Sequence, residues 1–151
     1  MDIIEKLKTY EGTKIYQLYK GFYKNGKFHI YKDSLGYSTI GYGRLVQGKE
    51  EQYKDGITEA QADALLLEDI GNARVYLDEL RLDLPVESRW NDFMVMMIFQ
   101  LGIGKVQQFK KFLTAMRAKN YATAIVEIKN SNWYRQTPNR VNDMIRYVTQ
   151  G

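Results

Sequence analysis

Apolar side chains recur at helical spacing over most of the chain, and this periodicity predicts a mainly helical protein. Residues 2–10 predict a short amphipathic helix that stops at Gly12, and residues 58–80 predict a long one. Thr58 and Gln61 stand three positions apart at the start of the long helix, which is the pattern of a capping box. The chain is therefore expected to begin with a helix and to return to helix at residue 58, with a non-helical pattern in the interval between.

The most apolar part of the sequence follows the long helix. Pro85 predicts the start of a further helix, because proline is favoured at a first turn, and residues 102–104 (GIG) predict its end. The run 93–99 is nearly all apolar, and a helix that is hydrophobic all round is buried. Three further helices are expected at residues 109–118, 121–129 and 139–148, with a turn-rich bridge at 130–138.

Residues 13–57 are rich in strand-forming side chains and turn signals instead. Asn25-Gly26, a strong hairpin signal, separates two expected strands at 15–23 and 28–32. A second turn at residues 34–36 predicts another hairpin within residues 30–43. The expected fold class is therefore α+β, in one domain over 1–151. Its small β lobe spans about 13–57, and its helical lobe spans about 1–12 and 58–151.

The composition excludes several kinds of functional site. The chain has 151 residues, no cysteine and a single histidine, which excludes disulfides, cysteine-ligated zinc and a site built from several histidines. The net charge of +4 favours encounter with a polyanion such as a cell-wall polymer or a nucleic acid, or simply reflects a slightly cationic surface. No apolar run is long enough to span a membrane, and the charged N-terminus does not match a signal peptide.

Two carboxylates are the candidate chemical groups. Glu11 lies at the predicted end of the first helix, Asp33 lies at the bend of the second hairpin, and Thr39 returns beside Asp33. A carboxylic acid and a carboxylate facing one another can divide acid and base work in glycoside hydrolysis, while a hydroxyl can hold the attacking water. The chain contains 18 acids, however, so one such pair near a turn can also arise without function.

Four segments carry a more specific signal: Glu11-Gly12, residues 30–43 (IYKDSLGYSTIGYG), residues 98–102 (IFQLG) and residues 133–140 (WYRQTPNR). Their content and order resemble the phage-type lysozymes over nearly the whole chain. The resemblance implies a two-lobed lysozyme-like fold with the active-site cleft between the lobes. It also implies hydrolysis of the β-1,4 bond between N-acetylmuramic acid and N-acetylglucosamine in bacterial peptidoglycan, with no cofactor and no metal.

The resemblance also assigns roles to residues. It implies that Glu11 is the general acid and that Asp33 and Thr39 position the nucleophilic water in an inverting reaction. It implies substrate-binding roles at four more positions: Leu45, Phe99, Gln100 and Arg140.

The chain departs from the family in three ways that bear on the site. The interval between Glu11 and Asp33 is longer than in the family and contains no other acid, so Asp33 stays the candidate. Arg44 replaces a histidine of the family, which predicts an Arg44–Asp69 ion pair. Phe112 and Glu127 occupy two sugar-contact positions of the family with different chemistry.

The leading hypothesis is an endolysin that releases phage progeny by lysing the host. It would be a monomer made in the host cytoplasm that reaches the periplasmic cell wall at lysis, with peptidoglycan as its partner, no nucleic acid and no membrane span. A tail-associated lysozyme, a lytic transglycosylase and a non-enzymatic cell-wall-binding module are the alternatives. The Asp33 and Thr39 pair argues against a transglycosylase, because those groups serve a water nucleophile.

Overall fold

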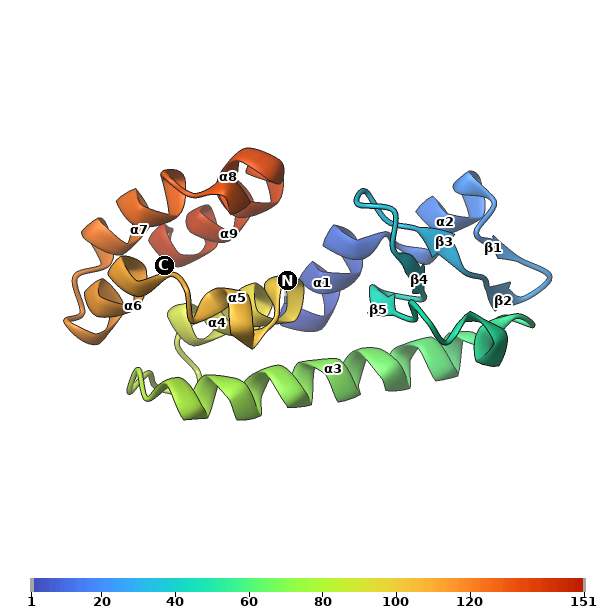
Figure 1. The fold of residues 1–151 in the computed structure, drawn as a ribbon, viewed down its shortest axis with the longest axis horizontal. Helices are drawn as coiled ribbons and strands as arrows, with labels where there is room; N and C mark the ends of the chain where they lie inside the picture. The colour runs from blue at the N-terminus through green and yellow to red at the C-terminus, as the bar shows by residue number, and fades with distance from the viewer. Residues whose placement is uncertain (1, 151) are drawn as a thin grey trace. The chain divides into compact units, whose positions relative to one another are not determined.

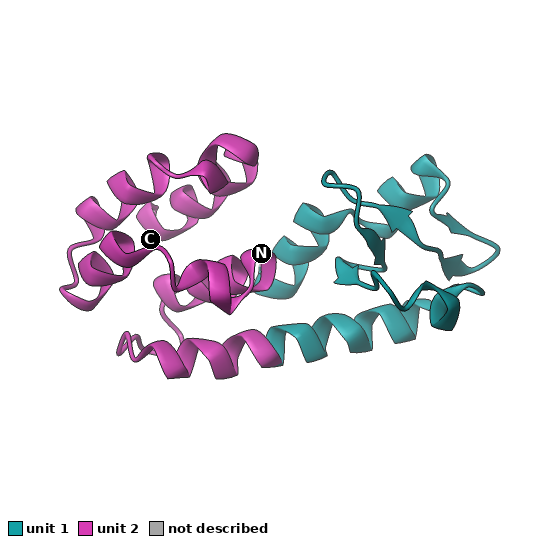
Figure 2. Ribbon diagram, viewed as in Figure 1, with its two compact units in different colours: residues 1–71 teal, residues 72–151 magenta. Residues whose placement is uncertain are grey.

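The computed structural model describes residues 2–150 and confirms an α+β fold. The chain divides into two compact units, residues 1–71 and 72–151 (Figure 2). The long helix α3 (Glu59–Leu80) begins in the first unit and ends in the second (Figure 1). The division into a β lobe and a helical lobe within one domain stays a prediction.

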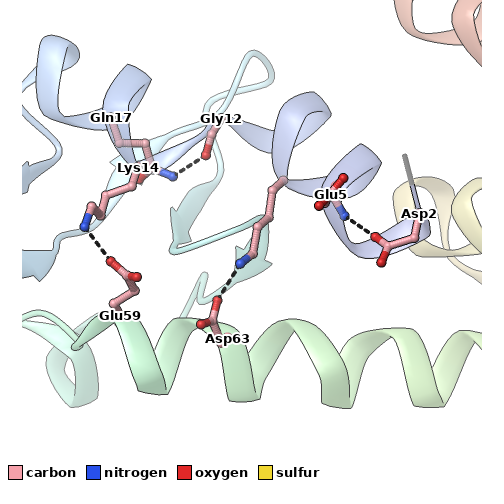
Figure 3. Close-up of polar contacts among 8 residues, drawn as sticks. Asp2, Glu5, Gly12, Lys14, Gln17, Glu59 and Asp63 are labelled. Carbon is pink, nitrogen blue, oxygen red and sulfur yellow. Dashed lines mark hydrogen bonds and ion pairs between the residues drawn. The ribbon is translucent and has the colours of Figure 1, made fainter.

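The first unit opens with α1 (Ile3–Glu11), which agrees with the expected helix to within one residue at each end. Asp2 caps its N-terminus by accepting a hydrogen bond from the backbone N–H of Glu5 (Figure 3). Gly12 ends the helix with φ of 108°, a conformation that glycine adopts without strain. Glu11 is therefore the last helical residue, as the sequence predicted.

The expected strand over residues 15–23 is wrong in most of its length. Residues Lys14–Lys20 form the helix α2. Thr13 caps it by accepting from the backbone N–H of Tyr16, and Gly21 ends it in the left-handed conformation. These local caps outweigh the strand preference of isoleucine and tyrosine, because β-propensity depends strongly on context. A Thr13-to-Gly21 capping pattern was the signal that the strand prediction overlooked.

The Asn25-Gly26 hairpin is confirmed, although its strands are short. β1 (Tyr23–Lys24) pairs with β2 (Lys27–Phe28), and both turn residues have positive φ. Phe28 is fully buried and its backbone bridges to Ile57, which fastens this hairpin to the segment before α3.

A second, three-stranded antiparallel sheet carries the second hairpin. Its strands are β3 (Tyr31–Lys32), β4 (Ser38–Ile40) and β5 (Arg44–Leu45), in that spatial order. The central strand β4 is wholly buried. In the register, Thr39 lies opposite Tyr31 on one side and Leu45 on the other.

A 3-10 turn, η1 (Glu50–Tyr53), leads to α3. The predicted capping box is present, because Thr58 and Gln61 each accept a hydrogen bond from the other's backbone N–H at 3.1 and 2.8 Å. Lys8 and Lys14 form ion pairs with Asp63 and Glu59 of α3, which join α1 and α2 to this helix (Figure 3).

The second unit is helical and is built around α4 (Arg89–Leu101), in which residues 93–98 are all buried. This helix begins later than predicted. Ser88 caps it, whereas Pro85 lies in the turn before it. The expected bridge at 130–138 contains a short helix, because Ser131 supplies another N-cap. The remaining helices of the unit are α5 (Ile103–Val106), α6 (Lys110–Arg117), α7 (Tyr121–Lys129), α8 (Asn132–Gln136) and α9 (Pro138–Thr149).

Within residues 2–150, no helix combines the length and the apolar character needed to cross a membrane.

Candidate active site

Glu11 packs against the turn between β4 and β5. A Cβ atom added to Gly43 would lie 2.8 Å from the Oε1 atom of Glu11 and 2.9 Å from its carboxyl carbon. Gly43 also has φ of +91°, where side chains are strained. The carboxyl group of Glu11 therefore lies directly on backbone, at a place where only glycine leaves enough room.

Asp33 is held by the turn that it begins. Its Oδ1 atom accepts hydrogen bonds from the backbone N–H groups of Leu35 and Tyr37, at 2.9 and 2.8 Å. Its own N–H donates to the carbonyl of Tyr37, and its carbonyl accepts from Gly36. Two backbone donors on one oxygen fix the direction of the carboxylate, and this fixed direction is what a group that orients a water molecule requires.

Thr39 is linked to Asp33 through Tyr37. The Thr39 hydroxyl donates to the same Tyr37 carbonyl at 3.1 Å, and the residue is only 4% exposed. Because the hydroxyl proton is used in this bond, the oxygen can only accept a further hydrogen bond, through its lone pairs, from a donor such as water. The structure thus brings the predicted Asp33 and Thr39 together around one peptide group.

Tyr31 belongs to the same site, and the sequence analysis missed it. Burial raises its pKa well above the usual value for tyrosine, and the negative charges of Glu11 and Asp33 raise it further. The ring lies within electrostatic reach of both carboxylates and stacks on Phe22 at 4.8 Å. The available signal was its position two residues before Asp33, since alternate strand residues share a face.

Gln17 ties the end of α1 to the β4–β5 turn, and it too was missed. Its side-chain amide donates to the carbonyl of Gly12 at 2.8 Å and to that of Gly41 at 2.9 Å (Figure 3 shows the first bond). The residue is 1% exposed. Gly12 follows Glu11 and Gly41 precedes the Gly43 contact, so Gln17 fixes both backbone segments between which the Glu11 carboxyl lies.

The predicted Arg44–Asp69 ion pair is confirmed. Arg44 contacts both Asp69 oxygens at 3.0 Å and also reaches Glu68 at 2.9 Å. Burial raises the pKa of the Asp69 carboxyl against the opposing effect of Arg44. Burial also disfavours the charge of Arg44, but Asp69 and Glu68 outweigh it and raise the pKa of the guanidinium. Both pKa values are therefore raised, which stabilises the charge of Arg44 but not that of Asp69, because the partly buried carboxylate incurs a desolvation cost that its two contacts with Arg44 offset only in part.

The predicted sugar-contact positions have different surroundings. Leu45 is exposed on β5, opposite Thr39 in the sheet, so it lies beside the carboxylate site. In the second unit, Phe99 and Arg140 are half-buried, and Gln100 accepts a 2.9 Å hydrogen bond from the indole of Trp133. That these three residues complete one site with Glu11 stays a prediction.

Phe112 and Glu127, which depart from the family at sugar-contact positions, differ from each other in exposure. Phe112 is 1% exposed in the core of the second unit, so it cannot contact a sugar there. Glu127 lines a hollow of about 460 Å³ together with Lys110 and Lys111. Within residues 2–150, no three histidine or acidic side chains gather as they would around a metal ion.

An α+β fold with an acid at a helix end, and an acid and a hydroxyl on a hairpin of the same unit, is the arrangement expected of a hydrolase of the lysozyme type. Comparison with known sequences agrees, because the family described as Phage lysozyme matches residues 21–146. The chain belongs to the phage lysozyme family, as its four sequence segments predicted.

Individual relatives extend this comparison. "Probable T4-type lysozyme 1" of Dictyostelium discoideum is 30% identical over 149 residues, which cover 83% of this chain and 88% of that protein. "Peptidoglycan hydrolase gp36" of Pseudomonas phage phiKMV is 30% identical over 117 residues, or 77% of this chain and 13% of that protein. "Pre-baseplate central spike protein Gp5" of Enterobacteria phage T4 is 28% identical over all of this chain and 28% of that protein.

Proposed function

We propose that this lysozyme hydrolyses the β-1,4 bond between N-acetylmuramic acid and N-acetylglucosamine of bacterial peptidoglycan. The observation that carries the proposal is that the Glu11 carboxyl packs on Gly43 between β4 and β5, while β4 carries Thr39, whose hydroxyl shares the Tyr37 carbonyl with the backbone N–H of Asp33. These contacts support a site that combines two carboxyl groups and a hydroxyl from separate elements. This is the set of groups that hydrolysis of a glycosidic bond uses.

In the proposed mechanism, Glu11 donates its proton to the oxygen of the leaving sugar as the glycosidic bond breaks. Positive charge develops on the other sugar ring, and a water molecule held by Asp33 and the lone pair of Thr39 attacks from the opposite face. Asp33 takes the proton of this water. Direct attack by water inverts the anomeric configuration, which requires room for the water between the two carboxyl groups.

The remaining groups bind and orient. Leu45 beside Thr39 is proposed to contact a sugar ring, and Phe99, Gln100 and Arg140 are proposed to contribute from the helical unit. Tyr31 keeps its proton over the working pH range because its pKa is raised, so it can donate a hydrogen bond without adding negative charge to the site.

The proposed cellular role is that of an endolysin, a monomer of one domain that acts on the host cell wall at lysis. A tail-associated lysozyme is the second candidate, because the match to the spike protein Gp5 covers all of this chain, although only 28% of Gp5. Detecting the protein in purified virions would favour the second role, and finding it only in the infected-cell lysate would favour the first.

Product analysis tests the reaction itself. We expect purified peptidoglycan treated with the protein to yield soluble muropeptides with reducing N-acetylmuramic acid ends, and the first product seen by NMR to have the α configuration. Mass spectrometry that finds 1,6-anhydro ends instead would identify a transglycosylase. Tight binding to peptidoglycan without any soluble product would identify a binding module.

Replacing Gln17 by methionine is expected to lower kcat about tenfold or more. The variant loses the hydrogen bonds to the Gly12 and Gly41 carbonyls, so the backbone around Glu11 can shift, and small displacements of a reacting group lower the rate. It should also lower the free energy of unfolding by about 1–3 kcal/mol, since two carbonyls lose their donor. Steady-state hydrolysis and urea unfolding measure the two effects.

Gln61→Met provides the matched control for this variant. It removes another side-chain amide of the first unit, the one in the capping box, and should reduce stability by about 0.5–2 kcal/mol while kcat is kept. A Gln17→Met enzyme with unchanged kcat, or with a loss that is matched by Gln61→Met, would reduce Gln17 to a purely structural residue.

A further inference from the structure

The helix α2 exposes apolar side chains and buries a polar one. Ile15, Leu18 and Tyr19 are 78%, 59% and 86% exposed, whereas its only buried residue is Gln17. Positions i, i+3 and i+4 of a helix lie on one face, so these three form a continuous stripe. We call them the α2 apolar stripe. A soluble helix normally has the reverse pattern, with its apolar face toward the core.

The rest of the unit holds this stripe outward. The two hydrogen bonds of Gln17 and the caps at Thr13 and Gly21 fix the helix at both ends and along its buried side. Lys14 adds an ion pair to Glu59 of α3. Turning the stripe inward would break these contacts and leave the Gln17 amide without its carbonyl partners, so the outward orientation is a stable feature of the fold.

Positive charge follows the stripe at the C-terminal end of α2. No aspartate or glutamate occurs between Gly12 and Asp33, while this interval contains five lysines. Lys20 and Lys24 are exposed close to the C-terminal end of α2, and Lys27 follows on the next strand. An apolar helical face bordered by lysines matches a surface that is apolar inside and anionic outside.

We propose that the α2 apolar stripe docks the protein on an anionic lipid surface. Ile15, Leu18 and Tyr19 enter the boundary between headgroups and acyl chains, and the neighbouring lysines contact headgroup phosphates. The chemistry of the stripe favours lipid over glycan, because Ile15 and Leu18 offer sugars neither hydrogen bonds nor an aromatic face, and the amphipathic ring of Tyr19 also suits a membrane interface. It also disfavours a second copy of the chain, because a symmetric contact would bring the lysines of both copies together.

Co-sedimentation of the full chain with vesicles tests this proposal. We expect binding to phosphatidylcholine vesicles that contain phosphatidylglycerol, weaker binding in high salt, and little binding to phosphatidylcholine alone. The triple variant Ile15→Ser, Leu18→Ser, Tyr19→Ser should bind the anionic vesicles at least about tenfold more weakly, because the apolar part of the binding energy is removed. Tyr19→Ser alone, at the most exposed position, should show a partial loss in case the triple variant unfolds.

Val86→Ser with Val126→Ser is the matched control, since both valines are exposed in the second unit and lie outside the stripe. This variant should bind the vesicles like the wild type, and so should Glu11→Gln, which separates docking from hydrolysis. Equal vesicle binding by the triple variant and the wild type would overturn the proposal. So would a loss seen only with lipid-free peptidoglycan, or a wild-type dimer in light scattering that the triple variant abolishes.

Discussion

Replacing Glu11 by glutamine is expected to lower kcat for peptidoglycan hydrolysis by about 10²–10⁴-fold, the contribution that a positioned general acid makes. Glutamine keeps the size of the side chain and its packing against Gly43, but it cannot donate a proton to the leaving oxygen. The fold should be retained, because glutamine has the same shape and can still hydrogen-bond. The release of reducing ends from purified peptidoglycan measures the loss, and circular dichroism checks the fold.

Glu5→Gln is the matched control, since it removes an equal charge from the first turn of the same helix. It should leave kcat unchanged. If Glu11→Gln also hydrolyses at the wild-type rate, the general acid is another residue and the proposed assignment of roles fails.

Replacing Gly43 by alanine is the second change with a large expected effect, a loss of about 10²-fold in kcat. The new Cβ atom would lie 2.8 Å from Oε1 of Glu11, so the carboxyl group must move by several tenths of an ångström or more. Displacements of about this size in a reacting group can cost two orders of magnitude in rate. Alanine held at the positive φ of Gly43 should also reduce the free energy of unfolding by about 1–2 kcal/mol, because L-residues with a side chain are strained there.

Gly48→Ala separates these two effects. Gly48 has φ of +83° and no atom within 4 Å of an added Cβ, so alanine there meets the same backbone strain without touching Glu11. We expect a similar loss of stability in urea unfolding and a wild-type kcat. Equal losses of kcat in both variants would show that backbone strain, and not displacement of Glu11, lowers the rate.

The sequence was a good guide wherever local signals agreed with the tertiary structure. Helical periodicity with a glycine stop placed α1 to within one residue, and the capping box placed the start of α3. The resemblance to a family then singled out Glu11, Asp33 and Thr39 from 18 acids and many hydroxyls. Spacing alone left that choice open, because a carboxylate near a turn is common.

The errors concern short elements, where a few hydrogen bonds outweigh side-chain preference. α2 contains residues that favour strands, yet its caps and the buried amide of Gln17 hold it helical. α4 begins at the cap of Ser88 and not at Pro85 for a similar reason. Tyr31 was overlooked because its role depends on the through-space charges of residues distant in the sequence.

The sequence by itself thus determined the longer helices, the two turns and the family, and through the family it pointed to the proposed acid and water-positioning groups. It could do so because periodicity, caps and motifs are properties of neighbouring residues. Only the tertiary structure decided the conformation and the contacts of the long interval between Glu11 and Asp33. That interval supplies Gln17, which fixes the backbone around Glu11, and an apolar stripe that faces outward. Both depend on contacts with Gly41 and α3, which no local pattern encodes.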